Sequence, residues 1–320
     1  MAEQSIEVRV RCITYQTDTI NSYELVSTGE KELPPFTAGA HINLHLSAGV
    51  IRSYSLVNDQ QERHRYVIAV NRDANSRGGS SFVHDSLKVG AIIKIDCPRN
   101  NFELVEDASH SVLIAGGIGI TPLLAMVRRL EALGRTWQLF YAARTRGAAA
   151  FLDELYALRA NTDLNLRTDF DDERSGLLFD IKAIVQNAPP DAHLYCCGPT
   201  AMLQAFEAAT ADRSPDRVHV EYFQTTEAPA TEGGFDVVLA RSGRTITVNG
   251  GQTILDALLE AGVAVNYSCS SGVCGTCETR VIEGIPDHRD QYLSKDEQAD
   301  NKLIMVCCSG AITKRLVLDL

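Results

Sequence analysis

The stretch Cys-Ser-Ser-Gly-Val-Cys-Gly-Thr-Cys at residues 269–277 holds three of the nine cysteines of this 320-residue chain. Its spacing is Cys-x4-Cys-x2-Cys with one distant partner, which is the plant-type pattern for a 2Fe-2S cluster bound by four thiolates. Gly272 and Gly275 allow the loop to bend, so that backbone N–H groups can approach the sulfurs. The predicted iron ligands are therefore Cys269, Cys274, Cys277 and Cys307.

Two alternatives compete with this assignment of the iron ligands. Structural zinc prefers paired Cys-x2-Cys knuckles, and only Cys274 and Cys277 form one here. Cys308 directly follows Cys307 and competes with it for the fourth position, but the plant-type spacing selects Cys307. The other cysteines are expected to be small buried residues; they are Cys12, Cys97, Cys196, Cys197 and Cys308, with Cys197 a possible exception.

Length and charge narrow the class of protein. A chain of 320 residues predicts two or three domains. The net charge is −11, and no basic block stands out, which argues against nucleic acid or anionic membranes as partners. The longest apolar stretch, residues 112–126, is interrupted by glycine, threonine and proline and is too short to span a bilayer. Because the first residues lack the apolar segment of a secretion signal, we expect a cytoplasmic protein.

The pattern of short elements changes along the chain. Residues 1–107 read as short alternating strands separated by turns, which predicts an antiparallel β-barrel. Residues 108–224 alternate strand and helix, which predicts a doubly wound parallel sheet. Residues 225–234 lack periodicity and form the predicted linker. Residues 235–320 begin with a hairpin and a helix near 253–259, and the cysteine loop follows; an α+β β-grasp ferredoxin domain is expected.

Two elements of the barrel segment suggest an anion site beside a ring-binding strand. Arg52 and Tyr54 share one face of a strand, where arginine can clamp a phosphate and the aromatic ring can lie against a flat heterocycle. Alone, such a pair is more typical of a structural strand. However, the Ser-Arg-Gly-Gly-Ser-Ser stretch at 76–81 runs into a helix expected near Phe82, and helix starts of this kind bind phosphate. Together they fit a mononucleotide such as FMN.

The sequence Ala-Gly-Gly-Ile-Gly-Ile-Thr-Pro at 115–122 lies between an apolar strand and a helix. Glycines in such a turn let a pyrophosphate approach the backbone, and proline suits the first helical turn. The residues predicted to bind the nucleotide here are Gly116, Gly117, Gly119, Thr121 and Pro122. A second turn, Cys-Gly-Pro at 197–199, follows another strand at its carboxyl end, where the switch-point rule places ligands. For Cys197 the alternative is a buried cysteine that merely ends a strand.

In the order of these parts, the chain resembles the phthalate dioxygenase reductase family over nearly its full length. That family combines an FMN barrel, an NAD domain and a plant-type ferredoxin. The resemblance implies NADH, FMN and a 2Fe-2S cluster as cofactors, and a terminal Rieske-type oxygenase as a transient partner near the cluster loop. It implies that Arg52, Gly78, Gly79, Ser80 and Ser81 bind the FMN phosphate, and that Tyr54 and Ser55 contact the isoalloxazine. It places Cys197, Gly198 and Pro199 beside the nicotinamide and Phe223 against the flavin, so that Ser55, Cys197 and Phe223 flank the reacting atoms.

Two points stay open from the residues alone. Arg144 and Arg146 could bind the 2′-phosphate of NADPH, whereas the acidic run at 169–173 would repel it; the family resemblance favours NADH. The same electron-transfer chain could also serve a separate ferredoxin or a di-iron hydroxylase. A redox-sensing iron–sulfur module is the third interpretation, and the intact flavin and nucleotide motifs argue against it.

Overall fold

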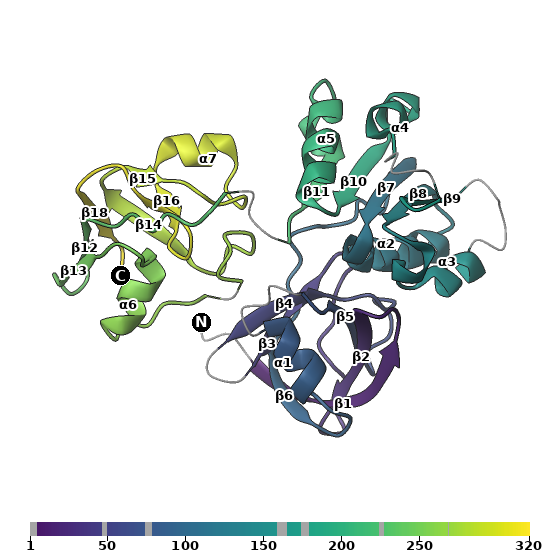
Figure 1. Ribbon diagram of the computed structural model, residues 1–320, viewed down its shortest axis with the longest axis horizontal. Helices are drawn as coiled ribbons and strands as arrows, with labels where there is room; N and C mark the ends of the chain where they lie inside the picture. Colours follow the sequence, from purple (N-terminus) through teal and green to yellow (C-terminus); the bar gives the residue numbers. More distant parts are fainter. Residues whose placement is uncertain are drawn as a thin grey trace. The chain divides into compact units, whose positions relative to one another are not determined.

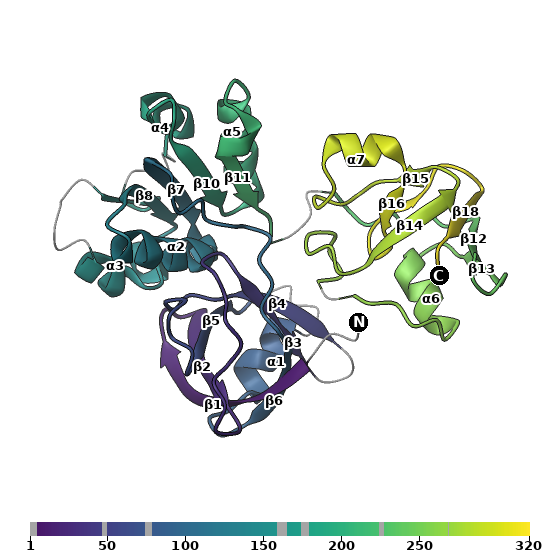
Figure 2. The ribbon, with the colours of Figure 1, turned by 180° about the vertical axis from the view of Figure 1, so that it is seen from behind.

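The computed structural model describes residues 5–46, 50–73, 79–158, 165–173, 179–223, 227–267 and 269–320. The chain divides into two compact units, Met1–Glu221 and Tyr222–Leu320. Figure 1 and Figure 2 show the ribbon from opposite sides, with the first unit in purple to green and the second in green to yellow. None of the described helices is long and apolar enough to cross a bilayer.

The first unit begins with the predicted antiparallel barrel. Its strands are β1 (Ser5–Tyr15), β2 (Ile20–Ser27), β3 (His41–His45), β4 (Ile51–Ser55), β5 (Tyr66–Asn71) and β6 (Ile92–Asp96). They are ordered β4-β3-β6-β1-β2-β5, and a bridge between Leu56 and Ile68 joins the two outer strands. Successive side chains of β1 point to opposite faces of the sheet, so Val8 and Val10 are fully buried while Glu7 and Arg9 face outward.

Helix α1 (Gly79–Ser86) packs on the barrel through the buried Val83. The sequence led us to expect this helix to start near Phe82, but it starts three residues earlier. Its first turn therefore consists of Gly79, Ser80 and Ser81, the residues that were expected to form a loop. The early start places their backbone N–H groups at the N-terminal end of the helix, which is where helices bind anions.

The second part of this unit is the predicted doubly wound domain. Its strands are β7 (His110–Gly116), β8 (Thr136–Ala143), β9 (Leu166–Phe170), β10 (His193–Cys197) and β11 (Val218–Glu221). All pair in parallel in the order β11-β10-β7-β8-β9, so the order reverses between β7 and β10. The helices are α2 (Ile120–Ala132), α3 (Leu152–Leu158), α4 (Ile181–Asn187) and α5 (Thr200–Thr210). Short 3-10 turns lie at η2 (Gly117–Gly119), η3 (Arg146–Ala148) and η5 (Pro215–Arg217).

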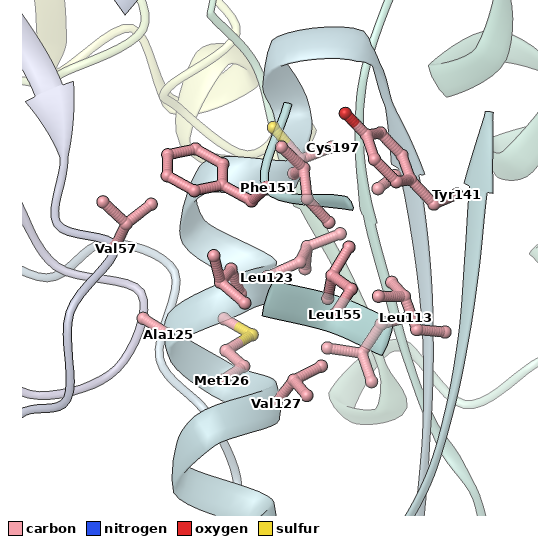
Figure 3. Close-up of a cluster of buried hydrophobic side chains, with 14 of the residues drawn as sticks. Val57, Leu113, Leu123, Ala125, Met126, Val127, Tyr141, Phe151, Leu155 and Cys197 are labelled. Carbon is pink, nitrogen blue, oxygen red and sulfur yellow. The ribbon is translucent and has the colours of Figure 1, made fainter. Parts of the chain in front are cut away.

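One hydrophobic cluster joins the barrel to the doubly wound domain. Figure 3 shows Val57, from the barrel segment, on the same side of α2 as Ala125, and both belong to one buried cluster. An ion pair strengthens the same junction, since Arg129 of α2 donates to Glu106 through Nε and Nη2 at 2.7 and 2.6 Å. The change of pattern near residue 107 therefore separates two architectures that share a core, and the boundary at 107/108 stays a prediction.

The second unit has the predicted β-grasp fold. Its five-stranded sheet contains β12 (Phe235–Leu239), β13 (Thr245–Val248), β14 (Glu278–Glu283), β16 (Leu303–Met305) and β18 (Arg315–Leu318). The order is β13-β12-β18-β14-β16, and only β12 and β18 run parallel. A small pair, β15 (Pro286–Asp287) with β17 (Gly310–Ala311), and the helices α6 (Ile254–Glu260) and α7 (Lys295–Asp300) complete the unit. Capping boxes at Thr253 and Ser294 fix where the two helices begin.

Part of the predicted linker, from residue 227 onward, packs on this second unit. Ala230 is buried, and its N–H donates to the Cys308 carbonyl at 2.8 Å. The Thr231 carbonyl accepts from the Gly251 N–H at 2.7 Å. These contacts tie the segment to the residue beside a predicted iron ligand, while residues 224–226 lie outside the described part.

Candidate electron-transfer sites

The cysteine loop is shaped to present N–H groups to sulfur. Ser270, Gly272 and Gly275 all adopt positive φ angles, of 51°, 65° and 72°. This backbone turns the Ser271 N–H toward the sulfur of Cys269 and the Gly272 N–H toward that of Cys307, each at 3.3 Å. N–H donors of this kind stabilise the negative charge of cluster thiolates.

Three of the predicted ligands come together in this loop. The sulfur of Cys269 lies within hydrogen-bonding reach of both Cys274 and Cys307. Cys277 is buried directly before β14 and belongs to the core of the unit. No group of three or more His, Cys, Asp or Glu side chains in the described ranges is arranged as for one metal ion. A 2Fe-2S cluster divides its four thiolates between two irons, so the donors present suit that group.

A neighbouring segment holds the cysteine loop in place. The Tyr292 ring covers Gly275 so closely that a Cβ at this glycine would lie 2.2 Å from the ring carbon Cζ. The Gly272 carbonyl accepts from the Gln291 N–H at 3.0 Å. Asp290 is buried, and its carboxylate accepts from the Leu293 N–H at 2.8 Å. Glycine is therefore required at 275 both for its backbone angle and for the contact with the ring.

In the barrel, the structure brings Arg52 to the start of α1. A Cβ at Gly79 would lie 2.6 Å from Arg52 Nε and 2.8 Å from Cγ, so the arginine passes directly over this glycine. Ser80 and Ser81 follow in the first turn of the helix. A guanidinium beside the N–H groups of a helix start is a donor set that suits a phosphate monoester. Gly78, also predicted here, lies outside the described residues.

Strand β4 carries the two residues predicted to contact the ring. Tyr54 pairs with Ile42 and Ser55 with His41, so the two side chains point to opposite faces of the strand. Burial raises the pKa of Tyr54 above its ordinary value, which keeps the phenol protonated and able to donate. Ser55 is buried at the end of the strand. A flat ring at the outer edge of β4 would have a donor on each side of the strand.

In the parallel sheet, the two predicted nucleotide turns touch each other at the switch point. A Cβ at Gly116 would lie 2.5 Å from Cδ of Pro199, and one at Gly119 would lie 2.2 Å from the Cys197 carbonyl oxygen. Gly198 would similarly meet Gly116 Cα at 3.1 Å. Larger side chains at these positions would push apart the ends of β7 and β10. Glycine thus allows the backbones at these two strand ends to approach each other closely.

The remaining residues of this turn start α2. Gly117 has φ +53°, and a Cβ there would meet no atom within 4 Å, so its backbone faces open space. Thr121 is buried, and its hydroxyl donates to the Ile118 carbonyl at 3.0 Å. Pro122 lies buried in the first turn of the helix. An exposed glycine backbone before a helix start is the arrangement that admits a pyrophosphate.

The comparisons with known proteins identify two of the predicted domains. Residues 237–311 match the model of the 2Fe-2S iron-sulfur cluster binding domain, and residues 113–208 match that of the oxidoreductase NAD-binding domain. Phthalate dioxygenase reductase, a solved structure described as modular for electron transfer from pyridine nucleotides to [2Fe-2S], superposes with a TM-score of 0.79. Its sequence is 39% identical to this chain, and the match covers 99% of this chain and 98% of the solved one. The chain belongs to the phthalate dioxygenase reductase family.

Two curated relatives of this family member are more similar still. The phenoxybenzoate dioxygenase subunit beta of Ectopseudomonas oleovorans is 54% identical over 315 residues, which is 98% of this chain and 97% of the relative. The tetrachlorobenzoquinone reductase of Sphingobium chlorophenolicum is 51% identical over 319 residues, which is 99% of this chain and 98% of the relative. Two relatives that are about equally similar to this chain thus differ in name: one is called a dioxygenase subunit and the other a quinone reductase.

Two of the three residues predicted to flank the reacting atoms differ in exposure in this reductase. Cys197 is fully buried at the end of β10 and belongs to the hydrophobic cluster around α2, where Figure 3 labels it. Burial raises its pKa well above the ordinary value, so the thiol stays protonated. Phe223 is 38% exposed just after β11. Their roles at the nicotinamide and the flavin stay predictions, as do those of the other site residues.

Sequence reasoning missed Glu221, the last residue of β11. It pairs with Cys197 of β10 across the parallel ladder, beside the switch point. Its Oε2 atom is enclosed and has no hydrogen-bond partner among the described residues. Burial raises the pKa of Glu221 from 4.5 to about 8, so the group is mainly a neutral acid at pH 7. The signal in the sequence that could have revealed Glu221 is a single carboxylate at the end of the short strand Val-His-Val-Glu.

The raised pKa of Glu221 makes stability depend on pH. Between its unfolded pKa of 4.5 and its folded pKa of about 8, only the folded state holds the proton, so the free energy of unfolding falls as pH rises. Glutamine cannot ionise and avoids this loss. We expect Glu221→Gln to raise the free energy of unfolding by up to about 5 kcal/mol at ~pH 9 and by less than about 1 kcal/mol at ~pH 5. Thermal melts of the holoprotein at both pH values measure this.

The matched control is Glu103→Gln, which removes the same charge from an exposed position. It should shift the melting temperature equally at the two pH values. Equal melting temperatures for the Glu221 variant and the parent at high pH would show that its carboxyl is ionised without penalty.

Proposed function

We propose that this chain is the reductase component of a two-component oxygenase, which takes a hydride from NADH and passes single electrons to a terminal Rieske-type oxygenase. The observation that carries the proposal is that one chain combines a β-barrel, an NAD-binding domain and a plant-type ferredoxin domain with its cysteine loop. The full-length likeness to an oxygenase subunit and to phthalate dioxygenase reductase supports it.

Each site contributes binding and placement. Arg52 and the first turn of α1 would hold the phosphate of FMN, with Tyr54 and Ser55 at its ring. The glycine turns at the ends of β7 and β10 would admit the NADH pyrophosphate and direct the nicotinamide toward the barrel. The cysteine loop would bind the two irons. When bound, FMN accepts the hydride as two electrons and a proton, and the cluster carries those electrons onward one at a time.

The partner is proposed to dock transiently near the cysteine loop. This loop is where single electrons would leave the chain, and Tyr292, which covers Gly275, is 39% exposed beside it. The substrate of the oxygenase is a property of that partner. A cytoplasmic location stays a prediction alongside it.

A second candidate function is the reduction of a quinone. The 51% identical relative named tetrachlorobenzoquinone reductase favours it. Quinones accept two electrons and can take them directly from a reduced flavin, so this activity would not need the cluster. The two functions therefore differ in whether a variant lacking the cluster remains active with its physiological acceptor.

An anaerobic NADH titration followed by visible absorbance tests the proposal. We expect the flavin and the iron–sulfur bands to bleach together, and chromatography of the released flavin to identify FMN. Turnover is then measured with cytochrome c, a one-electron acceptor, and with a benzoquinone. Bleaching of the flavin without reduction of the cluster would overturn the electron path, and quinone turnover that survives loss of the cluster would favour the second function.

A further inference from the structure

The ends of β8 and β9 lie where a bound dinucleotide would place its adenosine ribose. In doubly wound sheets the pyrophosphate lies at the glycine turn after the first strand, and the residue that meets the ribose 2′ position follows roughly 20 residues later, beyond the second strand. Here the first strand is β7 and the second is β8, which ends at Ala143. The neighbouring strand β9 ends at Phe170. The Asp171 N–H donates to the Ala143 carbonyl at 3.2 Å, so the two strand ends are joined.

One arginine at this place is held on three sides. Arg146, in the turn after β8, donates from Nε to Oε1 of Glu173 at 3.1 Å and from Nη2 to Oε2 at 3.3 Å. Its Nη1 donates to the Tyr156 hydroxyl at 3.2 Å. The plane of the guanidinium lies over the Phe170 ring, with Cζ 4.6 Å from the centroid. The fork geometry that would suit a phosphate is thus occupied by a carboxylate.

The charges around this arginine also oppose a phosphate. Asp171 and Asp172 precede Glu173 in the same turn, and the backbone N–H of Asp172 donates to the Arg144 carbonyl at 3.2 Å. Among the described residues, the turns after β8 and β9 therefore present two arginines against three carboxylates; Arg174, the next residue in the sequence, lies outside the described part. A 2′-phosphate, which adds about two negative charges at neutral pH, would have to displace Glu173 and approach the two aspartates.

We infer that the Arg146–Glu173 pair selects NADH over NADPH, because Glu173 occupies the guanidinium that would otherwise bind a 2′-phosphate. The inference rests on the proposed function, since it assumes that a nicotinamide dinucleotide binds in this crevice. Arg146 is then a latent phosphate ligand, oriented by Phe170 and Tyr156 and masked by one side chain.

The pair is suited to a role in selection because it does little for stability. The side chains of Arg146 and Glu173 are 55% and 50% exposed, and ion pairs at such exposure contribute little to folding. Removing Glu173 should therefore leave the fold intact. Because Phe170 and Tyr156 remain in contact with the guanidinium, Arg146 should stay in place with two N–H groups released.

The test is the binding of 2′,5′-ADP and of 5′-AMP to the oxidised holoprotein, measured by calorimetry. For Glu173→Gln we expect 2′,5′-ADP to bind at least ~10-fold more tightly than to the parent, as a new charge-assisted pair predicts, while 5′-AMP changes less than ~2-fold. The KM for NADPH should fall in parallel. Neither ligand transfers electrons, so the result does not depend on the cluster or on the acceptor.

Two further variants separate release of Arg146 from a simple change in charge. Asp172→Asn removes one negative charge from the same turn without releasing the arginine, and it should improve 2′,5′-ADP binding less than ~3-fold. The double variant Glu173→Gln with Arg146→Met should lose the gain. Equal gains for Asp172→Asn and Glu173→Gln, or a gain that survives the loss of Arg146, would overturn the inference. If neither the parent nor any variant binds 5′-AMP, it is the proposed dinucleotide site that fails.

Discussion

Replacing Cys274 by serine should abolish the visible absorbance of the iron–sulfur cluster and leave the reaction between NADH and ferricyanide intact. The loss is expected because Cys274 is predicted to be one of the four thiolate ligands, three of which lie in a loop whose N–H groups point at sulfur, and a serine hydroxyl is a poor iron ligand. The rate of electron transfer from NADH to cytochrome c should fall by more than ~10-fold, because loss of a ligand costs more than loss of a hydrogen bond to a ligand. Absorbance spectra and the two acceptor assays measure the effect.

The matched control is Cys308→Ser. Cys308 is buried beside Cys307, and its sulfur lies 3.8 Å from the Met305 carbonyl and within hydrogen-bonding reach of Cys307, but the plant-type spacing selects Cys307 as the ligand. The cluster should survive this change. If Cys308→Ser loses the cluster and Cys307→Ser retains it, the fourth ligand is misassigned. If Cys274→Ser also loses the ferricyanide reaction, the flavin and cluster sites do not function separately.

The second large effect is expected at the phosphate cradle. Replacing Arg52 by alanine should weaken retention of FMN by about 10- to 100-fold, because a charge-assisted pair with phosphate is worth roughly 1.5–3 kcal/mol. Flavin released on gel filtration, and fluorescence titration of the apoprotein with FMN, measure the affinity. Lysine at this position should restore part of it, since it keeps the charge but lacks the two-pronged donor.

Arg72→Ala provides the control for the loss of a barrel arginine near α1. Arg72 pairs at 3.2 Å with Asp85, which lies in the last turn of α1. It should leave the flavin content unchanged. Wild-type FMN affinity in the Arg52 variant would remove the arginine from the phosphate site.

The sequence predicted the fold well because its signals are local. Alternation is clear in β1, and three of the four cysteines of the plant-type pattern lie in one nine-residue stretch. Strand β9 and helix α4 were not identified. Leu166 to Phe170 contain three polar residues in a strand at the edge of its sheet, which weakens the apolar pattern. The start of α1 was misplaced because glycine and serine disfavour helix interiors but are accepted in a first turn.

Sequence motifs predicted individual site residues but not the contacts between them. Glycines at 116, 119 and 198 stood out as turn residues, but their mutual contact depends on the parallel pairing of β7 and β10. Glu221 became a candidate only through its register with Cys197. The contact between Arg146 and Glu173 joins two turns whose charges, taken from the sequence alone, favour opposite coenzymes. Residues that act across strands need the topology before their chemistry can be read.

The core shared by the barrel and the parallel sheet determines where this protein can be divided by recombination. Separating these two parts would expose Val57, Phe102 and much of α2, and every 100 Å² of apolar surface uncovered costs about 2.5 kcal/mol. The ferredoxin unit has a hydrophobic core of its own. An exchange of that unit between paralogous genes should therefore yield a viable hybrid with a new docking partner, whereas an exchange of the barrel alone should yield a chain that aggregates.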